Sequence, residues 1–284
     1  MLNKTILLSA FFSLTLGLTA QQPPAQSGAT PTWTLPHGTV VKDNGPRTYR
    51  FTVDYDTANV TGQVVHRERL SGDYTRGLAN GEVEWKNVGD AQVDGATAPY
   101  PAAQKQDYME GFHYPAGSPD TLKPDFFKGF PAGVVMERNL IWDTSMMESF
   151  GQSFFDRLQL NVPLHISADQ DVVMPGVGTF HSRDTVLEWV GRSKRNGQEC
   201  ALIDYRAFFN PLEISIGGLT IHGRSDFWGE IWVSLETRQI EYATIYEEVS
   251  GQMTIPGMDT PQLLSVFRMG RLEPLNPANV GGAE

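Results

Sequence analysis

The sequence has a single cysteine, Cys200, among its 284 residues. One cysteine excludes an intramolecular disulfide, so the fold must be held together by its core alone. Cys200 stands in a short apolar run that ends at Ile203, where a thiol serves as a small buried hydrophobe. No histidine flanks it in the sequence, and a reactive thiol needs such a partner. We therefore predict a structural role for this cysteine.

Basic residues are scarce as well. The 22 lysines and arginines stand against 33 aspartates and glutamates, which gives a formal net charge of −11. An acidic protein of this size repels the phosphates of nucleic acids and the headgroups of anionic membranes. Nucleic acid is therefore excluded as a partner, and the acidic balance is typical of a soluble exported protein.

The motifs that define many enzyme classes are absent. The sequence contains no Walker A loop, no dinucleotide-binding glycine pattern, no G-x-S-x-G elbow and no H-E-x-x-H zinc helix. We expect no cofactor and no metal site, and the catalytic residues of any enzyme here are unknown. An exported hydrolase with an unrecognised polar site around His66, Glu68 or His222 remains an alternative. A salt-bridged strand surface is the favoured interpretation of His66 and Glu68, and a turn is the favoured interpretation of residues 222–226.

Carboxylates are frequent in the C-terminal half. Glu230, Glu241, Glu247 and Glu248 could supply the paired carboxylates of a glycoside hydrolase. Charged residues on strands usually face the solvent, and we interpret these four in that way.

The only long apolar run lies at the N-terminus. Residues Ile6 to Leu18 follow the positive Lys4, are too few to span a bilayer comfortably, and precede the small residue Ala20. This pattern predicts a signal peptide at residues 1–20. A periplasmic or secreted bacterial protein follows, with no transmembrane segment in the mature chain.

Proline, glutamine and glycine mark both ends of the mature chain. Residues 21–36 read as a disordered Pro/Gln-rich leader, and residues 271–284 read as a disordered tail. Residues 37–270 between them form a single β-rich domain in this interpretation.

Within that domain, apolar residues alternate with polar ones. Residues 49–55 show a period of two, as a half-buried strand requires. Asn80-Gly81 and Asn196-Gly197 are strong signals for tight hairpin turns. The second turn places Lys194 opposite Glu199, a favourable pair of charges. Regular turn signals without βαβ alternation favour an antiparallel sheet.

One helix is predicted over residues 145–158. Ser145 and Glu148 match a capping box, and apolar residues recur every four positions after it. Residues 94–135 combine prolines with aromatic residues and predict a long ordered loop layer, either a lid or a structural cover. The predicted fold is mainly β: an antiparallel, strongly curved sheet or half-open barrel, with one amphipathic helix packed against it.

Aromatic residues supply the candidate binding site. Trp228 and Trp232 share one face of a strand, with Glu230 between them, which suits a partly wet binding wall. The helix presents a methionine- and phenylalanine-rich stripe that could line a cavity for an acyl chain. The candidate wall residues are Trp142, Met146, Phe150, Phe154, Trp228 and Trp232.

These observations favour an exported, non-catalytic binding or envelope-associated protein that holds an apolar or lipid-like ligand between helix and sheet. A plain sheet core is the competing interpretation of the tryptophans. A structural subunit that binds a protein partner through exposed aromatic residues is a further alternative.

The hairpin formed by residues 229–237 and 239–244 places an aromatic strand, an acidic turn and a return strand in succession. It resembles the recurrent hairpins of LolA/LppX-like exported bacterial proteins, over about the last hundred residues. The resemblance implies a curved antiparallel sheet with helices on its concave face, and a lipid or acyl ligand. The single helix and the long proline- and aromatic-rich insert depart from that pattern, so no site residue is transferred.

Overall fold

The structure is a computed structural model that describes residues 33–38, 41–131, 134–174, 176–216, 218–257 and 259–275. The predicted signal peptide at 1–20 lies outside these residues, as do residues 21–32 of the predicted leader and 276–284 of the predicted tail. The chain divides into two units, Met1–Trp33 and Thr34–Glu284, and the description below concerns the second.

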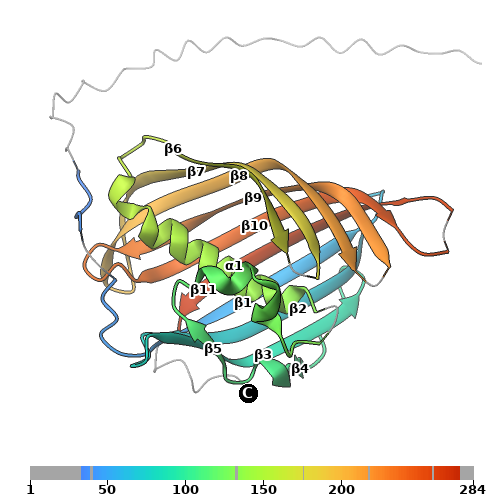
Figure 1. Cartoon of the computed structure of the whole chain (residues 1–284), viewed down its shortest axis with the longest axis horizontal. Coiled ribbons are helices and arrows are strands. Elements are labelled where there is room, and N and C mark those ends of the chain that lie inside the picture. The colour runs from blue at the N-terminus through green and yellow to red at the C-terminus, as the bar shows by residue number, and fades with distance from the viewer. Residues whose placement is uncertain are drawn as a thin grey trace, which may run out of the picture. The chain divides into compact units, whose positions relative to one another are not determined.

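One antiparallel sheet contains the described strands, in the order β4-β3-β2-β1-β11-β10-β9-β8-β7-β6, with β5 paired to β3. The sheet curves strongly around a helix (Figure 1). In this part of the chain its two edges do not pair with each other. The predicted fold class is confirmed. The strands are β1 (Arg47–Ala58), β2 (Val64–Arg76), β3 (Glu82–Asp94), β4 (Gln104–Lys105), β5 (Phe112–Pro115), β6 (Leu164–Met174), β7 (Gly178–Arg195), β8 (Gln198–Ile216), β9 (Leu219–Ser234), β10 (Ile240–Thr254) and β11 (Gln262–Pro274).

Local sequence signals account for much of this sheet. The inward-facing residues of β1 are Tyr49, Phe51, Val53 and Tyr55, and all four are buried. Asn196 and Gly197 form the β7–β8 turn with φ values of 50° and 77°, which only a few residue types tolerate. Lys194 lies opposite Glu199, as predicted, and their side chains form an ion pair. β11 pairs with β1 and continues to Pro274, so residues 271–274 lie in the sheet.

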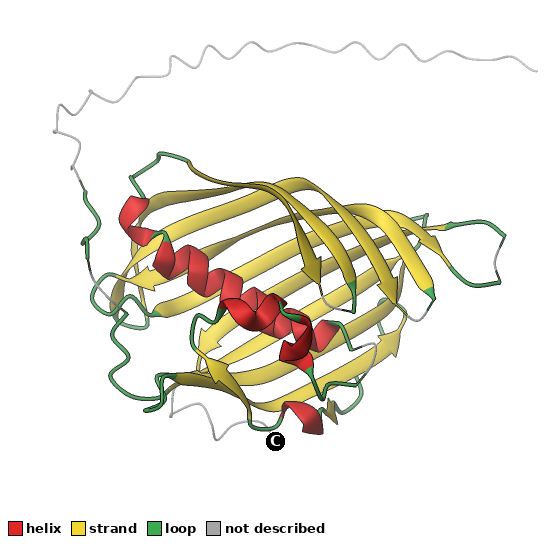
Figure 2. Cartoon of the chain, viewed as in Figure 1, coloured by secondary structure: helices red, strands yellow, loops and turns green. Residues whose placement is uncertain are grey.

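The helical segment lies on the concave side of the sheet (Figure 2). α1 (Met136–Glu148) is followed by a π-helical turn, η4 (Ser149–Ser153), and by the 3₁₀ turn η5 (Phe155–Arg157). The predicted start at Ser145 is wrong, because α1 begins nine residues earlier and Ser145 lies inside it. The first turns of α1 bury Glu137, Arg138 and Asp143 beside Leu140 and Ile141, so charged residues interrupt the apolar stripe on which the prediction relied. None of the described helices is long and apolar enough to cross a membrane.

An ordered layer of aromatic residues connects β3 to α1. It includes three 3₁₀ turns, η1 (Asp107–Met109), η2 (Pro119–Leu122) and η3 (Pro124–Phe127). The Phe112 and Phe130 rings meet edge to face with centroids 5.0 Å apart, and the Phe127 and Trp142 rings do so at 5.5 Å. These contacts join the layer to α1, as expected for aromatic anchors rather than a flexible loop.

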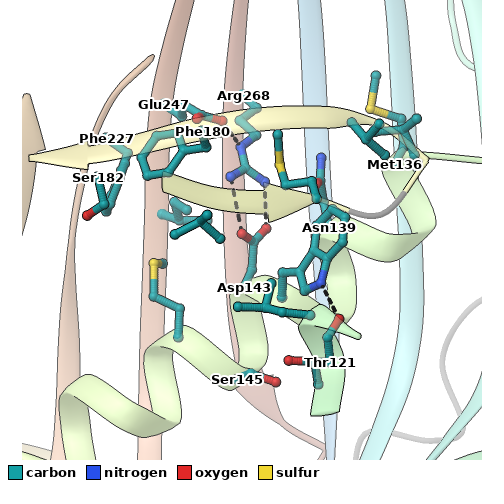
Figure 3. Close-up of a pocket in the computed structure, with 18 of the residues that line it drawn as sticks. Thr121, Met136, Asn139, Asp143, Ser145, Phe180, Ser182, Phe227, Glu247 and Arg268 are labelled. Carbon is teal, nitrogen blue, oxygen red and sulfur yellow. Dashed lines mark hydrogen bonds and ion pairs between the residues drawn. The ribbon is translucent and has the colours of Figure 1, made fainter. Parts of the chain in front are cut away.

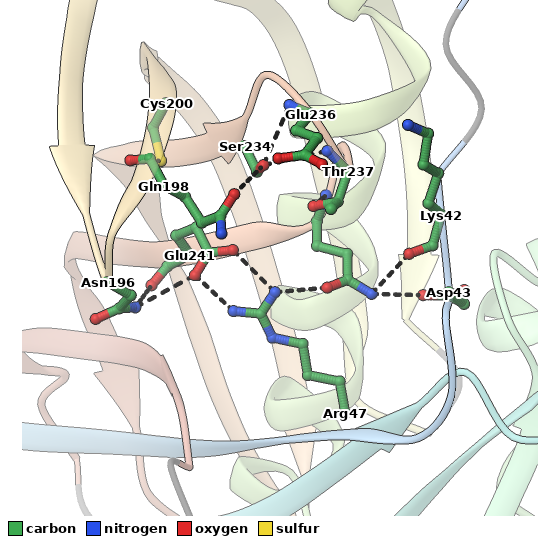
Figure 4. Close-up of polar contacts among 11 residues, drawn as sticks. Lys42, Asp43, Arg47, Asn196, Gln198, Cys200, Ser234, Glu236, Thr237 and Glu241 are labelled. Atoms are coloured by element: carbon green, nitrogen blue, oxygen red, sulfur yellow. Dashed lines mark hydrogen bonds and ion pairs between the residues drawn. The ribbon is translucent and has the colours of Figure 1, made fainter.

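A polar network ties β1 to β10 at the end of the sheet where β11 stops (Figure 4). Arg47 makes two hydrogen bonds to the Glu241 carboxylate, at 2.9 and 2.6 Å, and one to Gln239. Asn196, in the β7–β8 turn, also donates to Glu241. Glu241 is buried, so its interpretation as a solvent-facing residue is wrong. A buried carboxylate of this kind requires the paired guanidinium.

Close packing of the helix on the sheet depends on Gly151 in η4. A Cβ atom at this position would lie 3.1 Å from the Ile231 and Val233 side chains of β9. We expect Gly151→Val to lower the free energy of unfolding by about 1–3 kcal/mol, because the added methyl groups overlap the sheet. Gly191→Val is the control, since nothing lies within 4 Å of a Cβ there. Equal urea-unfolding midpoints for the two variants would contradict this packing.

Candidate functional site

A large cavity lies between the concave face of the sheet and the helical segment α1–η4. Its volume is about 1250 Å³, and its wall is formed by both the inner face of the sheet and the helix (Figure 3). Typical small-molecule sites occupy roughly 300–1,000 Å³. The cavity can therefore hold a sizeable ligand.

The sheet side of the cavity is mostly apolar. Every strand from β6 to β11 contributes side chains from its inner face, and Val177 of the β6–β7 turn adds another. Most of these side chains are only half-buried, so they line open space. Apolar surface left partly exposed inside a concavity is the usual property of a site for an apolar ligand. These residues are Ile166, Val172, Met174, Val177, Phe180, Leu212, Ile214, Leu219, Ile221, Phe227, Ile245, Val249, Leu264 and Val266.

The helical side contains four of the predicted wall residues. Trp142, Met146, Phe150 and Phe154 all line the cavity. The Trp142 indole N–H donates to the Thr121 carbonyl at 2.9 Å, which holds the end of η2 against α1. The Phe150 ring packs on the Tyr205 ring with centroids 5.4 Å apart.

The two predicted tryptophans of β9 lie elsewhere. Trp228 stacks on Tyr246 of the neighbouring strand, with ring centroids 5.9 Å apart. Trp232 lies beside Tyr242, and the Arg195 guanidinium covers both rings. Neither tryptophan lines the cavity, because the alternation of β9 directs Phe227 inward and its neighbour Trp228 to the other face. The structure therefore brings four of the six predicted wall residues together and places Trp228 and Trp232 outside the cavity.

A buried ion pair joins α1 to β11 across the cavity. Arg268 makes a two-pronged contact with Asp143, with nitrogen–oxygen distances of 2.6 and 3.1 Å. Its Nε also donates to Glu247 of β10, which in turn bonds the Ser225 hydroxyl. Burial raises the pKa of the Asp143 carboxyl, and the positive charge of Arg268 opposes that shift. Glu247 thus faces inward, and its interpretation as a solvent-facing residue is wrong.

A second buried pair joins the end of α1 to β2. The Arg76 Nη1 lies 2.6 Å from the Glu148 carboxylate, which also accepts a bond from the Tyr74 hydroxyl at 2.8 Å. Arg76 also pairs with Asp43 at 3.1 Å. Burial raises the pKa of the Glu148 carboxyl, and Arg76 counteracts this. Two arginines of the sheet therefore hold two carboxylates of the helix.

Polar residues of β2 and β3 extend the wall beyond these pairs. Glu68 and its cross-strand neighbour Gln92 line the cavity together with Asp90. Burial, together with the charges of Asp90 and Glu137, raises the pKa of Glu68 to about 7. Asp90 accepts a hydrogen bond from Gln92 at 2.7 Å. Sequence patterns gave no signal for this group, apart from the strand position of Glu68.

The residues considered for a hydrolase do not converge. His66 pairs with Asp94 at 2.9 Å, and His222 lies 3.6 Å from Glu213, both at exposed positions. Three strands separate β2 from β9 in the sheet. Within the described residues, no three histidine, cysteine or carboxylate side chains are arranged to hold a metal ion. Cys200 is fully buried, as predicted, and burial raises the pKa of its thiol to about 11.

No family model and no curated protein matches the sequence. Among solved structures, one of lipovitellin, described by its lipid–protein interactions, aligns with 86% of this chain at a TM-score of 0.40 and 10% identity. The alignment covers 26% of lipovitellin, so this chain spans about a quarter of that protein. A DUF1329 family protein from Desulfovibrio piger aligns with 85% of this chain and 89% of its own, at a TM-score of 0.14 and 10% identity. Similarities this low carry no argument about function.

The buried pair between Arg268 and Asp143 should dominate the stability of the helix–sheet contact. We expect Arg268→Met to lower the free energy of unfolding by about 3–5 kcal/mol, because it leaves buried carboxylates without a cation. The control is Arg69→Met, which removes the more exposed Arg69–Asp54 pair and should cost about 1 kcal/mol or less. Urea unfolding followed by tryptophan fluorescence measures both, and similar losses would rule out the proposed dominance.

Glu68 should make stability depend on pH. Its raised pKa means that the folded state retains a proton which the unfolded state loses near pH 4.5. The contribution of the protonated Glu68 side chain to the free energy of unfolding is therefore complete below pH 4.5 and disappears as the pH rises through about 7. We expect Glu68→Gln to gain stability relative to the natural protein as the pH rises from 5 to 8. Glu199→Gln, at an exposed site, should show no such trend in thermal unfolding.

Proposed function

We propose that this protein is an exported, non-catalytic binding protein that holds an apolar or lipid-like ligand in the cavity between α1 and the sheet. The single observation that supports this most is the mostly apolar sheet wall of a cavity of about 1250 Å³. A folded protein normally closes such a space, because close packing is favoured in an interior. An apolar space that stays open is best accounted for by a ligand that fills it.

Burial of an apolar chain in this cavity would be favourable. Each Å² of apolar surface removed from water contributes about 25 cal/mol to the free energy of binding, before the cost of ordering the ligand. The side chains of β6–β11 offer such surface along one side, and Met146, Phe150 and Phe154 offer it along the other. Methionine adapts to irregular shapes, which favours a flexible chain as the ligand.

Two sequence features support the remaining parts of the proposal. The N-terminal pattern of residues 1–20 supports export, and the absence of motif-defined catalytic residues supports a binding role. The resemblance of the β9–β10 hairpin to LolA/LppX-like proteins is consistent with a lipid or acyl ligand.

Two adjacent leucines of β11 provide a matched test. Leu264 lines the cavity, whereas Leu263 points to the other face and is 57% exposed. We expect Leu264→Asp to weaken the binding of the uncharged probe N-phenyl-1-naphthylamine at least tenfold, because a carboxylate in the apolar wall must be desolvated. Leu263→Asp should bind the probe as the natural protein does.

Fluorescence titration measures this binding, and circular dichroism confirms that both variants fold. Failure of the natural protein to bind the probe would contradict the proposed function. Equal binding by the two folded variants would show that the probe enters elsewhere.

A further inference from the structure

The charged residues of the cavity wall are strongly unbalanced. Six carboxylates and two guanidinium groups line it, a formal balance of −4, and no lysine or histidine is among the described lining residues. The two arginines are Arg76 and Arg268, each already shared between two carboxylates. No positive group in this wall is therefore left to receive an anion.

Three of the carboxylates lie at one end of the cavity. Glu68 of β2 and Asp90 of β3 are diagonal neighbours on the inner face of the sheet. Glu137, in the first turn of α1, lies close enough to influence the ionisation of Glu68. Within the described residues, neither Glu68 nor Asp90 forms an ion pair with a lysine or arginine, and the charge of Glu137 interacts with that of its neighbour Arg138. We call Glu68, Asp90 and Glu137 the acidic end of the cavity.

Individual atoms of the acidic end lack partners. The Asp90 Oδ1 atom is inaccessible to water and has no hydrogen-bond partner. The Glu137 side chain lines the cavity but is only 7% exposed. Tyr108 is its neighbour, and burial and the charge of Glu137 both raise the pKa of that phenol. Arg138, the next residue, stacks its guanidinium on Phe127 and does not line the cavity.

Glu137 is buried and Glu68 and Asp90 are half-buried, and carboxylates withdrawn from water are costly unless a cation or donor meets them. The positive end of the α1 dipole amounts to about half a charge, so it cannot balance three carboxylates. A metal ion does not fit either, because no three such groups in the described part of the chain are arranged to bind one. Carboxylates only accept hydrogen bonds, whereas an ammonium group donates three.

We propose that the ligand of this cavity is an amphiphile with a protonated amine head, held by Glu68, Asp90 and Glu137, with its apolar chain along β6–β11. This inference rests on the proposed function and adds the class of ligand. The same charges repel the carboxylate of a fatty acid and the phosphate of a phospholipid. The cavity thus selects against fatty acids and phospholipids through its acidic end and not through its apolar wall.

The test compares three ligands with one chain length: decylamine, 1-decanol and decanoate, at pH 7.5 and below their micelle-forming concentrations. Each displaces N-phenyl-1-naphthylamine from the natural protein. We expect half-displacement by decylamine at a concentration at least tenfold lower than by decanoate, with decanol between them. Decanoate acting as strongly as decylamine would overturn the inference.

Variants assign the preference to the acidic end. Glu137→Gln and Asp90→Asn each keep the side-chain shape and remove one charge, and we expect each to reduce the preference for decylamine over decanoate at least threefold. Glu199→Gln changes the net charge equally at an exposed site outside the wall, and should leave the ratio unchanged. A ratio unchanged in both cavity variants, or changed equally by Glu199→Gln, would overturn the assignment.

The outcomes separate the two proposals. If the probe and decanol bind but decylamine has no advantage, the head-group inference fails and the apolar binding function stands. If neither the probe nor any of the three ligands binds, the proposed function itself fails.

Discussion

The buried contacts of two arginines with α1 are the constraint on which the rest of the structure depends. Arg268 of β11 holds Asp143, and Arg76 of β2 holds Glu148, so long side chains of the sheet reach the helix at two points. A helix attached by apolar contacts alone would settle onto the apolar inner face and fill it. Two charged pairs hold α1 to the sheet as well, and Gly151 of η4 allows a close contact with β9. The cavity is the space that this attachment leaves.

The same pairs determine the charge of the cavity. Arg76 and Arg268 are its only described lining cations, and each is shared between two carboxylates. Both arginines are neutralised by carboxylates of the protein, so neither offers a free positive charge to the cavity. The acidic end, at Glu68, Asp90 and Glu137, therefore follows from how the helix is held.

Local patterns in the sequence are sufficient to predict the sheet but not the position of the helix. The alternation in β1 and the turn at Asn196-Gly197 depend on neighbouring residues, and they appear in the structure as expected. Asp143, in the second turn of α1, is buried against Arg268, a residue 125 positions away. No periodicity records such a contact. Charged residues in the first turns of a helix break its apolar periodicity, so the sequence does not predict the helix there even when those residues are buried.

The need for distant contacts also explains why the sequence does not show which face of β9 lines the cavity. A period of two in β9 shows that Phe227 and Trp228 face opposite sides, but apolar residues on both sides conceal which one faces the cavity. The inner face of this sheet carries Glu247 and Arg268, which resemble solvent-facing residues in the sequence. The face of the sheet that lines the cavity is the face that the helix covers, and Arg268 binds the helix on that face. Glu247 and Arg268 face inward because a helix with a buried carboxylate needs a cationic partner that only the inner face can supply, whereas charged residues such as Lys194 and Glu199 remain exposed.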